Sequence, residues 1–151
     1  MAEIIVDQSH CNYHLCLWFE SQGGVILFRD AGRVTRGGKG TQRKLLHLFE
    51  STGLPIPDVV AILKGNLYLV EIDSLTFKAI TSLGIYDKNK SLILKYVNGV
   101  SEMPHVSKMR VTFCKVGVTD LTRRSYFQVL EHGFDYIYFD APRSVKYVDF
   151  H

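Results

Sequence analysis

The stretch that most constrains the fold is an apolar hairpin, PIPDVVAILKGNLYLVEIDS, at residues 55–74. Two runs rich in β-forming residues flank Gly65-Asn66, a pair typical of two-residue hairpin turns that require positive φ. With this turn, Asp58 is predicted to face Asp73 across the hairpin. Both faces are apolar through the middle, which predicts a central position in a sheet that is covered on both sides.

Three carboxylates are predicted to gather at the open end of this hairpin. Side chains alternate along a strand, so Asp58, Glu71 and Asp73 share one face. Directly opposed residues lie about 5 Å apart at Cβ and diagonal ones about 7–8 Å apart. Like charges this close raise one another's pKa unless a counter-charge is present. A hard divalent ion with oxygen ligands, Mg²⁺ or Mn²⁺, would supply it. A three-residue turn would instead send Asp58 to the opposite face.

Each acid also has a structural explanation of its own. Pro57-Asp58 is a common start of a strand, and Asp73 or Ser74 is a suitable N-cap for a following helix. These explanations account for the acids one by one but not for their shared face. Both interpretations stay open, with the metal site as the leading one.

The rest of the chain alternates predicted strands with predicted helices. Six further strands are predicted, at residues 3–8, 14–20, 25–30, 109–118, 134–139 and 144–150. Helices are predicted at residues 41–53 with Thr41 as N-cap, at 74–84, and at 119–133 with Gly133 as the stop. Residues 90–97, KSLILKYV, fit either a helix or a strand. This order predicts an α/β (α+β) fold with a central mixed sheet flanked by helices.

Composition narrows the class of protein. With 151 residues, 46% hydrophobic and 22% charged, the chain is predicted to form one globular domain over residues 1–151. The apolar runs are too short to span a membrane. The N-terminus, MAEIIVDQSH, lacks a basic, apolar signal stretch, so a cytoplasmic (intracellular) location is expected. The three cysteines are expected to be free thiols. On the strand predicted there, HCNYHLC at residues 10–16 suits no ordinary zinc site.

Positive charge gathers in one glycine-rich stretch, RVTRGGKGTQRK, at residues 33–44. It has no acid and five cations: Arg33, Arg36, Lys39, Arg43 and Lys44. It is either a solvated flexible loop or a segment that contacts a phosphate backbone. Arg123 and Arg124 pose the same choice, between a solvated first helical turn and contacts to phosphates or base edges.

The hairpin resembles the PD-(D/E)XK nuclease superfamily, the fold of many type II restriction endonucleases. Pro57-Asp58 matches the first element of the motif and Glu71-Ile72 most of the second. The resemblance implies a restriction-endonuclease-like core and an endonuclease that hydrolyses DNA phosphodiester bonds with Mg²⁺ or Mn²⁺. Asp58 and Glu71 would hold the metal, and Glu50, on the preceding helix, would complete the ligand set.

One position departs from that pattern, because Asp73 stands where the family usually has a lysine. Asp73 or Lys78 would then orient the attacking water, with Lys88 and Lys90 as further replacements. PDVVAILKGNLYLVE and YIYFDAPRSVKYVDF resemble, in particular, the BsuBI/PstI-type restriction enzymes. A domain this small is expected to act as a homodimer on DNA, with RNA left open. The alternative is a non-catalytic nucleic-acid-binding or regulatory module that keeps the nuclease fold, which the missing lysine favours.

Overall fold

The computed structural model describes residues 4–30, 39–100, 102–120 and 124–149, with the side chains of residues 39, 124 and 125 left aside. The elements follow in the order α1 (Gln8–Ser21), β1 (Val25–Arg29), α2 (Lys39–Thr52), β2 (Val59–Leu63), β3 (Asn66–Asp73), α3 (Thr76–Lys88), α4 (Lys90–Asn98), β4 (Lys108–Val118), α5 (Arg124–Glu131), β5 (Asp135–Ala141) and β6 (Ser144–Val148). The described strands form one six-stranded sheet. The predicted α/β class, a mixed sheet flanked by helices, is confirmed.

The sheet combines two kinds of pairing. Strands β1, β2 and β3 form an antiparallel meander, and β5 pairs with β6 in the same way. In between, β3, β4 and β5 run parallel, so their connections cross over through helices: α3 and α4 before β4, and α5 before β5. The carboxyl ends of β3 and β4 therefore meet at one edge, where open α/β sheets bind their ligands.

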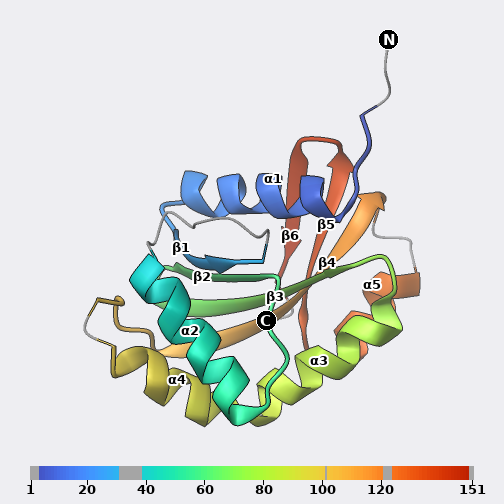
Figure 1. The fold of residues 1–151 in the computed structure, drawn as a ribbon. Coiled ribbons are helices and arrows are strands. Elements are labelled where there is room, and N and C mark those ends of the chain that lie inside the picture. Colours follow the sequence, from blue (N-terminus) through green and yellow to red (C-terminus); the bar gives the residue numbers. More distant parts are fainter. Residues whose placement is uncertain (1–3, 31–38, 101, 121–123, 150–151) are drawn as a thin grey trace.

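Helices cover both faces of the sheet, which gives three layers (Figure 1). Helix α1 lies on one face, where its Cys11, Leu15 and Phe19 pack on the strands. Helices α2, α3, α4 and α5 lie on the other face and bury a larger core. Strands β2 and β3 contribute to both cores, as expected for a hairpin that is buried on two sides. No helix in the described ranges is long and apolar enough to cross a membrane.

The prediction of strands at the N-terminus is wrong. Residues 4–6 form neither helix nor strand, and residues 8–21 form α1. Asp7 begins this helix, because its Oδ1 accepts a hydrogen bond from the backbone N–H of His10. The buried positions Cys11, Leu15 and Phe19 are spaced four residues apart, the period of a helix face and not of a strand.

Most other elements follow the predictions within a few residues. Strands β1, β4, β5 and β6 and helices α3 and α5 are confirmed, and Gly133 has the positive φ of a helix stop, 76°. The ambiguous segment at residues 90–97 is helical, with Ile93 and Val97 buried. Helix α2 begins at Lys39, so Thr41 lies inside its first turn and is not the N-cap.

Candidate active site

The turn of the β2–β3 hairpin lies one residue earlier in the chain than predicted. Lys64 and Gly65 occupy the turn, with φ of 51° and 76°, in place of Gly65-Asn66. Val59 therefore pairs with Val70, and the N–H of Asp58 donates to the Val70 carbonyl, which places Asp58 next to Glu71 instead of opposite Asp73. Moving the turn by one residue shifts the strand partner by two, and a shift of two leaves every side chain on its predicted face. The common face of Asp58, Glu71 and Asp73 therefore survives the error.

Backbone and side-chain contacts fix Asp58 at the entrance to β2. Its Oδ2 accepts a hydrogen bond from the backbone N–H of Ile72 at 2.7 Å, and its Oδ1 accepts one from Gln8 Nε2 at 3.3 Å. Asn12 of α1 donates to the Asp58 carbonyl at 3.1 Å. Burial raises the pKa of the Asp58 carboxyl, although the Ile72 N–H and a hydrogen bond with Glu71 oppose this. Helix α1 and strand β3 thus hold Asp58 from two sides.

Glu71 receives a hydrogen bond from the core beneath the hairpin. The hydroxyl of Tyr86, a fully buried residue of α3, donates to Glu71 Oε1 at 2.6 Å. Burial, followed by the charge of Asp58, raises the pKa of Glu71 to about 8. Tyr86 works against this rise, because its hydrogen bond favours the ionised carboxylate.

Asp58 and Glu71 form a hydrogen-bonded pair. Two carboxyl groups can bond in this way only when one of them carries a proton. The bond raises the pKa of Glu71 and lowers that of Asp58, so Glu71 is the donor and Asp58 the acceptor. Because the pKa of Glu71 is about 8, Glu71 keeps this proton at neutral pH. A cation placed between them would displace that proton.

Asp73 lies at the end of β3, on the rim of this pair. Its charge contributes to the raised pKa of both Asp58 and Glu71. It also has a local role, since its Oδ1 accepts a hydrogen bond from the backbone N–H of Leu75 at 2.9 Å. The predicted N-cap of α3, Asp73 or Ser74, is two residues or one residue early, because Leu75 occupies that position.

Lys115 is a residue of this edge that sequence reasoning missed. Strands β3 and β4 pair in parallel with Asp73 next to Lys115, so both side chains project from the same face of the sheet. Lys115 Nζ donates to the carbonyl of Ser74 at 2.5 Å. Nothing near residue 73 in the sequence signals this lysine, because only the pairing of β3 with β4 brings it there.

The other predicted catalytic and metal-binding residues lie exposed on helices. Lys78 is in the first turn of α3, and Lys88 and Lys90 lie at the junction of α3 and α4. Glu50 is on α2, and none of the hydrogen bonds described for Asp58 and Glu71 involves it. The described contacts therefore join Asp58, Glu71 and Tyr86 directly.

The predicted nucleic-acid contacts are only partly described. Arg33, Arg36 and Arg123 lie outside the described residues, as do the side chains of Lys39 and Arg124. The backbones of Lys39 and Arg124 begin α2 and α5, and Arg43 is exposed on α2. Lys44 Nζ contacts Glu102 Oε1 at 2.6 Å. The second half of the basic stretch is therefore helical, and the predicted loop does not extend to residue 44.

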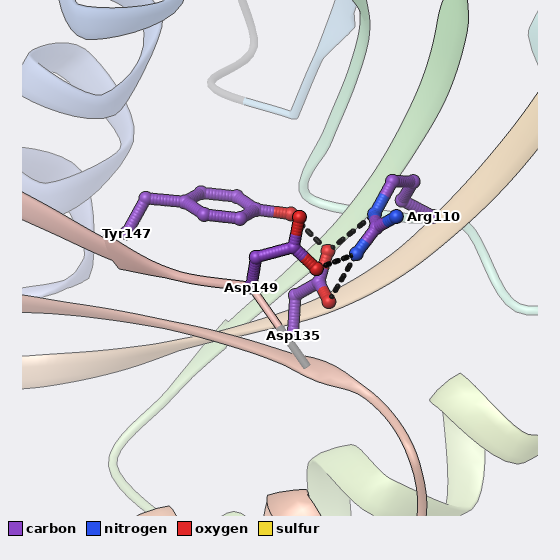
Figure 2. A network of polar contacts seen from close by, with 4 residues as sticks. All are labelled: Arg110, Asp135, Tyr147 and Asp149. Atoms are coloured by element: carbon purple, nitrogen blue, oxygen red, sulfur yellow. Dashed lines mark hydrogen bonds and ion pairs between the residues drawn. The ribbon is translucent and has the colours of Figure 1, made fainter. Parts of the chain in front are cut away.

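A second polar network lies at the opposite end of β4 and β5 (Figure 2). Arg110 binds Asp135 through two hydrogen bonds, Nε to Oδ2 at 2.7 Å and Nη2 to Oδ1 at 2.9 Å. Tyr147 also donates to Asp135, and Asp149 accepts from Arg110. Hydrogen bonding to Asp135 raises the pKa of Arg110. With Asp135 only 3% exposed, this network joins β4, β5 and the end of β6, and its role is structural.

The segment HCNYHLC is helical, so its spacing differs from the predicted one. His10 and His14 lie one turn apart on α1, with ring centroids 4.4 Å apart. His10 Nε2 contacts the carbonyl of Pro142, and burial lowers the pKa of His14, as do the charges of His10 and Arg143. A cation at this histidine pair would face Arg143, which disfavours metal binding.

A hollow lies between α2 and α4. It has a volume of about 640 Å³ and is lined by Lys44, Leu92, Lys95, Tyr96, Gly99, Val100 and Glu102. This lining offers an ion pair and a tyrosine whose hydroxyl already donates to the Lys44 carbonyl. It contains no pair of acids with a raised pKa. Because such pairs mark sites of acid, base or metal chemistry, Asp58 and Glu71 are the stronger candidate.

The acid pair has the donor chemistry that a hard cation needs. Carboxylate oxygens suit Mg²⁺ and Mn²⁺, and Mg²⁺ commonly binds through one or two carboxylates while it keeps several waters. Within the described ranges, no group of three or more histidine, cysteine, aspartate or glutamate side chains could hold a metal ion. The pair therefore fits an open, partly hydrated site and not a closed cage.

Comparisons of the chain with known protein families, with curated proteins and with solved structures find no match.

Proposed function

We propose that this chain is a metal-dependent nuclease that hydrolyses DNA phosphodiester bonds, with Asp58 and Glu71 as the ligands of Mg²⁺ or Mn²⁺. One observation carries the proposal: the two carboxyls lie side by side and partly buried at one edge of the sheet, and the pKa of each is raised. Separate structural roles do not explain why Glu71 keeps a proton next to Asp58, a position that a cation could take instead. The resemblance of Pro57-Asp58 and Glu71-Ile72 to the PD-(D/E)XK motif supports the same reaction.

Each residue of the edge has a role in this proposal. A divalent cation bound there supplies acidity to a bound water and shields the charge of the scissile phosphate. Asp58 and Glu71 would hold the cation once the proton between them has left, and the Tyr86 hydroxyl would fix one oxygen of Glu71. Asp73 would accept a hydrogen bond from the attacking water. Glu50 is a further ligand only if α2 moves toward the pair.

Lys115 is the best placed lysine to stabilise charge on the phosphate. It lies beside Asp73 in the sheet, and the Ser74 carbonyl holds its ammonium group. The superfamily's lysine would occupy residue 73, so Lys115 would bring the same charge to the edge from the neighbouring strand. Lys78 is the second choice, because it is fully solvated on α3.

Cleavage of plasmid DNA and of single-stranded DNA with Mg²⁺ tests the proposal. Asp58→Asn and Glu71→Gln keep the shape of the side chains and remove the charges that hold the cation, so cleavage should fall at least about a hundredfold. Glu131→Gln, an exposed acid at the end of α5, is the matched control and should cleave like the wild type. Cleavage that survives both site substitutions would exclude this site.

The second candidate is a nucleic-acid-binding or regulatory module with the same fold and no turnover. The observation that favours it is Asp73 at the lysine position, which adds negative charge where the substrate phosphate would lie. This module would be supported if the chain binds nucleic acid but cleaves neither single-stranded, double-stranded or supercoiled DNA nor RNA. A homodimer on DNA remains part of the nuclease proposal, and sedimentation of the chain with and without DNA tests it.

A further inference from the structure

Three apolar side chains near the acid pair are exposed to solvent. Ile56 is 39% exposed and lies two residues before Asp58. Leu75, 61% exposed, and Phe77, 82% exposed, follow the end of β3. Phe77 is thus an almost fully solvated aromatic ring in a chain whose other phenylalanines mostly fill the core. Isolated surface hydrophobics need no explanation, but these three lie in the chain shortly before Asp58 and shortly after Asp73.

The connection from Asp73 to Phe77 is short and fixed. Asp73 Oδ1 accepts from the Leu75 N–H, and Lys115 Nζ donates to the Ser74 carbonyl, so two side chains hold the turn that precedes α3. Four residues of chain place the Cα atoms of Asp73 and Phe77 at most about 14 Å apart. Thr76 and Ala79 face the core, which leaves Phe77 on the outer surface of the first turn.

Charge around Phe77 suits a polyanion. Lys78 follows it directly and is exposed, and Lys115 lies at the end of the neighbouring strand. A nucleotide whose base covered the Phe77 ring would therefore have ammonium groups near its phosphates. Aromatic side chains that interleave with cations in this way are the usual platform for unpaired bases.

We propose that Phe77 is a base-stacking platform, and that the substrate of this site is an unpaired nucleic-acid strand. The inference rests on the proposed function, since it places the base next to a phosphate held at Asp58 and Glu71. Inside a duplex the faces of a base are covered by its neighbours, so the ring can be reached only by a single strand or a frayed end. A protein partner is less suited to this surface, because three side chains supply less than the roughly 800 Å² that a partner commonly buries.

Binding without cleavage tests the platform. Fluorescence anisotropy would measure the affinity for a single-stranded DNA of about 12 nucleotides, in EDTA and at low salt. Phe77→Ala should weaken this binding about ten- to a hundredfold. Phe77→Tyr keeps the aromatic face and should bind like the wild type, which also shows that the fold tolerates substitution. Phe127→Ala, which removes another half-exposed phenylalanine, is the matched control.

A strand of the same length that lacks bases identifies the contact. Wild type and Phe77→Ala should bind this abasic strand equally, because no base is left to stack. The platform is wrong if Phe77→Ala binds the intact strand as tightly as the wild type, if its loss persists on the abasic strand, or if the wild type prefers a blunt duplex. Sedimentation that shows a dimer converted to monomers by Phe77→Ala would also overturn it, because a second copy would then cover the ring.

The two proposals fail separately. The anisotropy experiment is done in EDTA and involves no catalysis, so its outcome does not depend on whether the wild type cleaves DNA. If cleavage depends on Asp58 but Phe77→Ala binds single-stranded DNA as tightly as the wild type, the nuclease proposal is supported and the platform is wrong. If binding depends on Phe77 but no nucleic acid is cleaved, the platform is supported and the nuclease proposal is wrong.

Discussion

The Tyr86 hydroxyl donates a hydrogen bond to Glu71 Oε1 at 2.6 Å, so a buried side chain of α3 orients a carboxyl at the edge of the sheet. This bond favours the ionised form of Glu71. Tyr86→Phe should therefore raise the pKa of Glu71 further, as ¹³C-carboxyl NMR would measure. It should also lower the free energy of unfolding by about 1 kcal/mol.

Tyr96→Phe is the matched control for that substitution. The Tyr96 hydroxyl also makes one hydrogen bond, to the Lys44 carbonyl at 2.7 Å. Its loss should cost a similar free energy of unfolding and leave the pKa of Glu71 unchanged. An unchanged Glu71 pKa in Tyr86→Phe would contradict the role given to the hydroxyl.

Stability should decrease as the pH rises toward 8. The pKa of Glu71 is about 8 in the folded protein and about 4.5 in the unfolded chain, so the folded state binds the extra proton between these values. The free energy of unfolding should then fall by up to about 1.4 kcal/mol per pH unit until Glu71 ionises. The pKa of His14 is lowered, which gives the opposite slope only below about pH 6.5. Urea unfolding at pH 6.5, 7 and 7.5 measures this slope below the range in which the cysteines titrate, and Glu71→Gln should remove the contribution of Glu71.

Divalent cations should stabilise the protein more at high pH than at low pH. Binding at the acid pair requires the shared proton to leave, so Mg²⁺ or Mn²⁺ competes with it. At a cation concentration about 100 times the dissociation constant, the gain should be about 2.7 kcal/mol at pH 8.5. Thermal unfolding at pH 6 and pH 8.5 measures the difference. Equal shifts in the wild type and in Asp58→Asn would mean that the cation binds elsewhere.

Substitution of the two candidate lysines should change different kinetic constants. Lys115→Met removes a charge held beside Asp73, and kcat should fall about a hundredfold, the usual cost of removing one group that stabilises the transition state. Lys78→Met removes an exposed charge and should raise KM with little change in kcat. Steady-state cleavage of a labelled oligonucleotide distinguishes them. A large fall in kcat for Lys78→Met, with a change in KM alone for Lys115→Met, would instead assign the stabilisation of the phosphate charge to Lys78.

The Arg110 network should dominate stability at the other end of the sheet. Asp135→Ala leaves the largely buried guanidinium of Arg110 without its bidentate partner, and the free energy of unfolding should fall by about 3–5 kcal/mol. Asp149→Ala removes the exposed partner of the same arginine and should cost less than about 1 kcal/mol. Urea unfolding of both variants gives the comparison, and equal losses would show that burial does not set the cost.

The central hairpin could be predicted from the sequence, because the alternation of side chains in both of its strands gives the same assignment of faces. Alternation along both strands fixed the faces, so an error of one residue in the turn left Asp58 and Glu71 together. Helix α1 was missed although Asp7 and the spacing of Cys11 and Leu15 carry a helical signal. The aromatic residues Tyr13, Trp18 and Phe19 of this segment favour a strand locally, and packing on the sheet selects the helix.

The contacts that complete the site could not be predicted in the same way. Tyr86 reaches Glu71 through the packing of α3 on the sheet, and Lys115 reaches Asp73 through the parallel pairing of β3 with β4. Both are long-range contacts, and neither residue belongs to a local motif. Local patterns specify strands and their faces, whereas the partner of a buried carboxyl depends on how distant elements pack.

Strand order in the sheet is the same as strand order along the chain. During synthesis, each new strand can therefore add to the edge left by the one before it, so the sheet can grow in one direction. Asp58, Glu71 and Tyr86 all belong to the part that is made by the end of α3, whereas Lys115 emerges later on β4. The two acids and the tyrosine that donates to Glu71 are therefore complete before the strand that carries Lys115 is made, so the hairpin and α3 can establish the acid pair without β4.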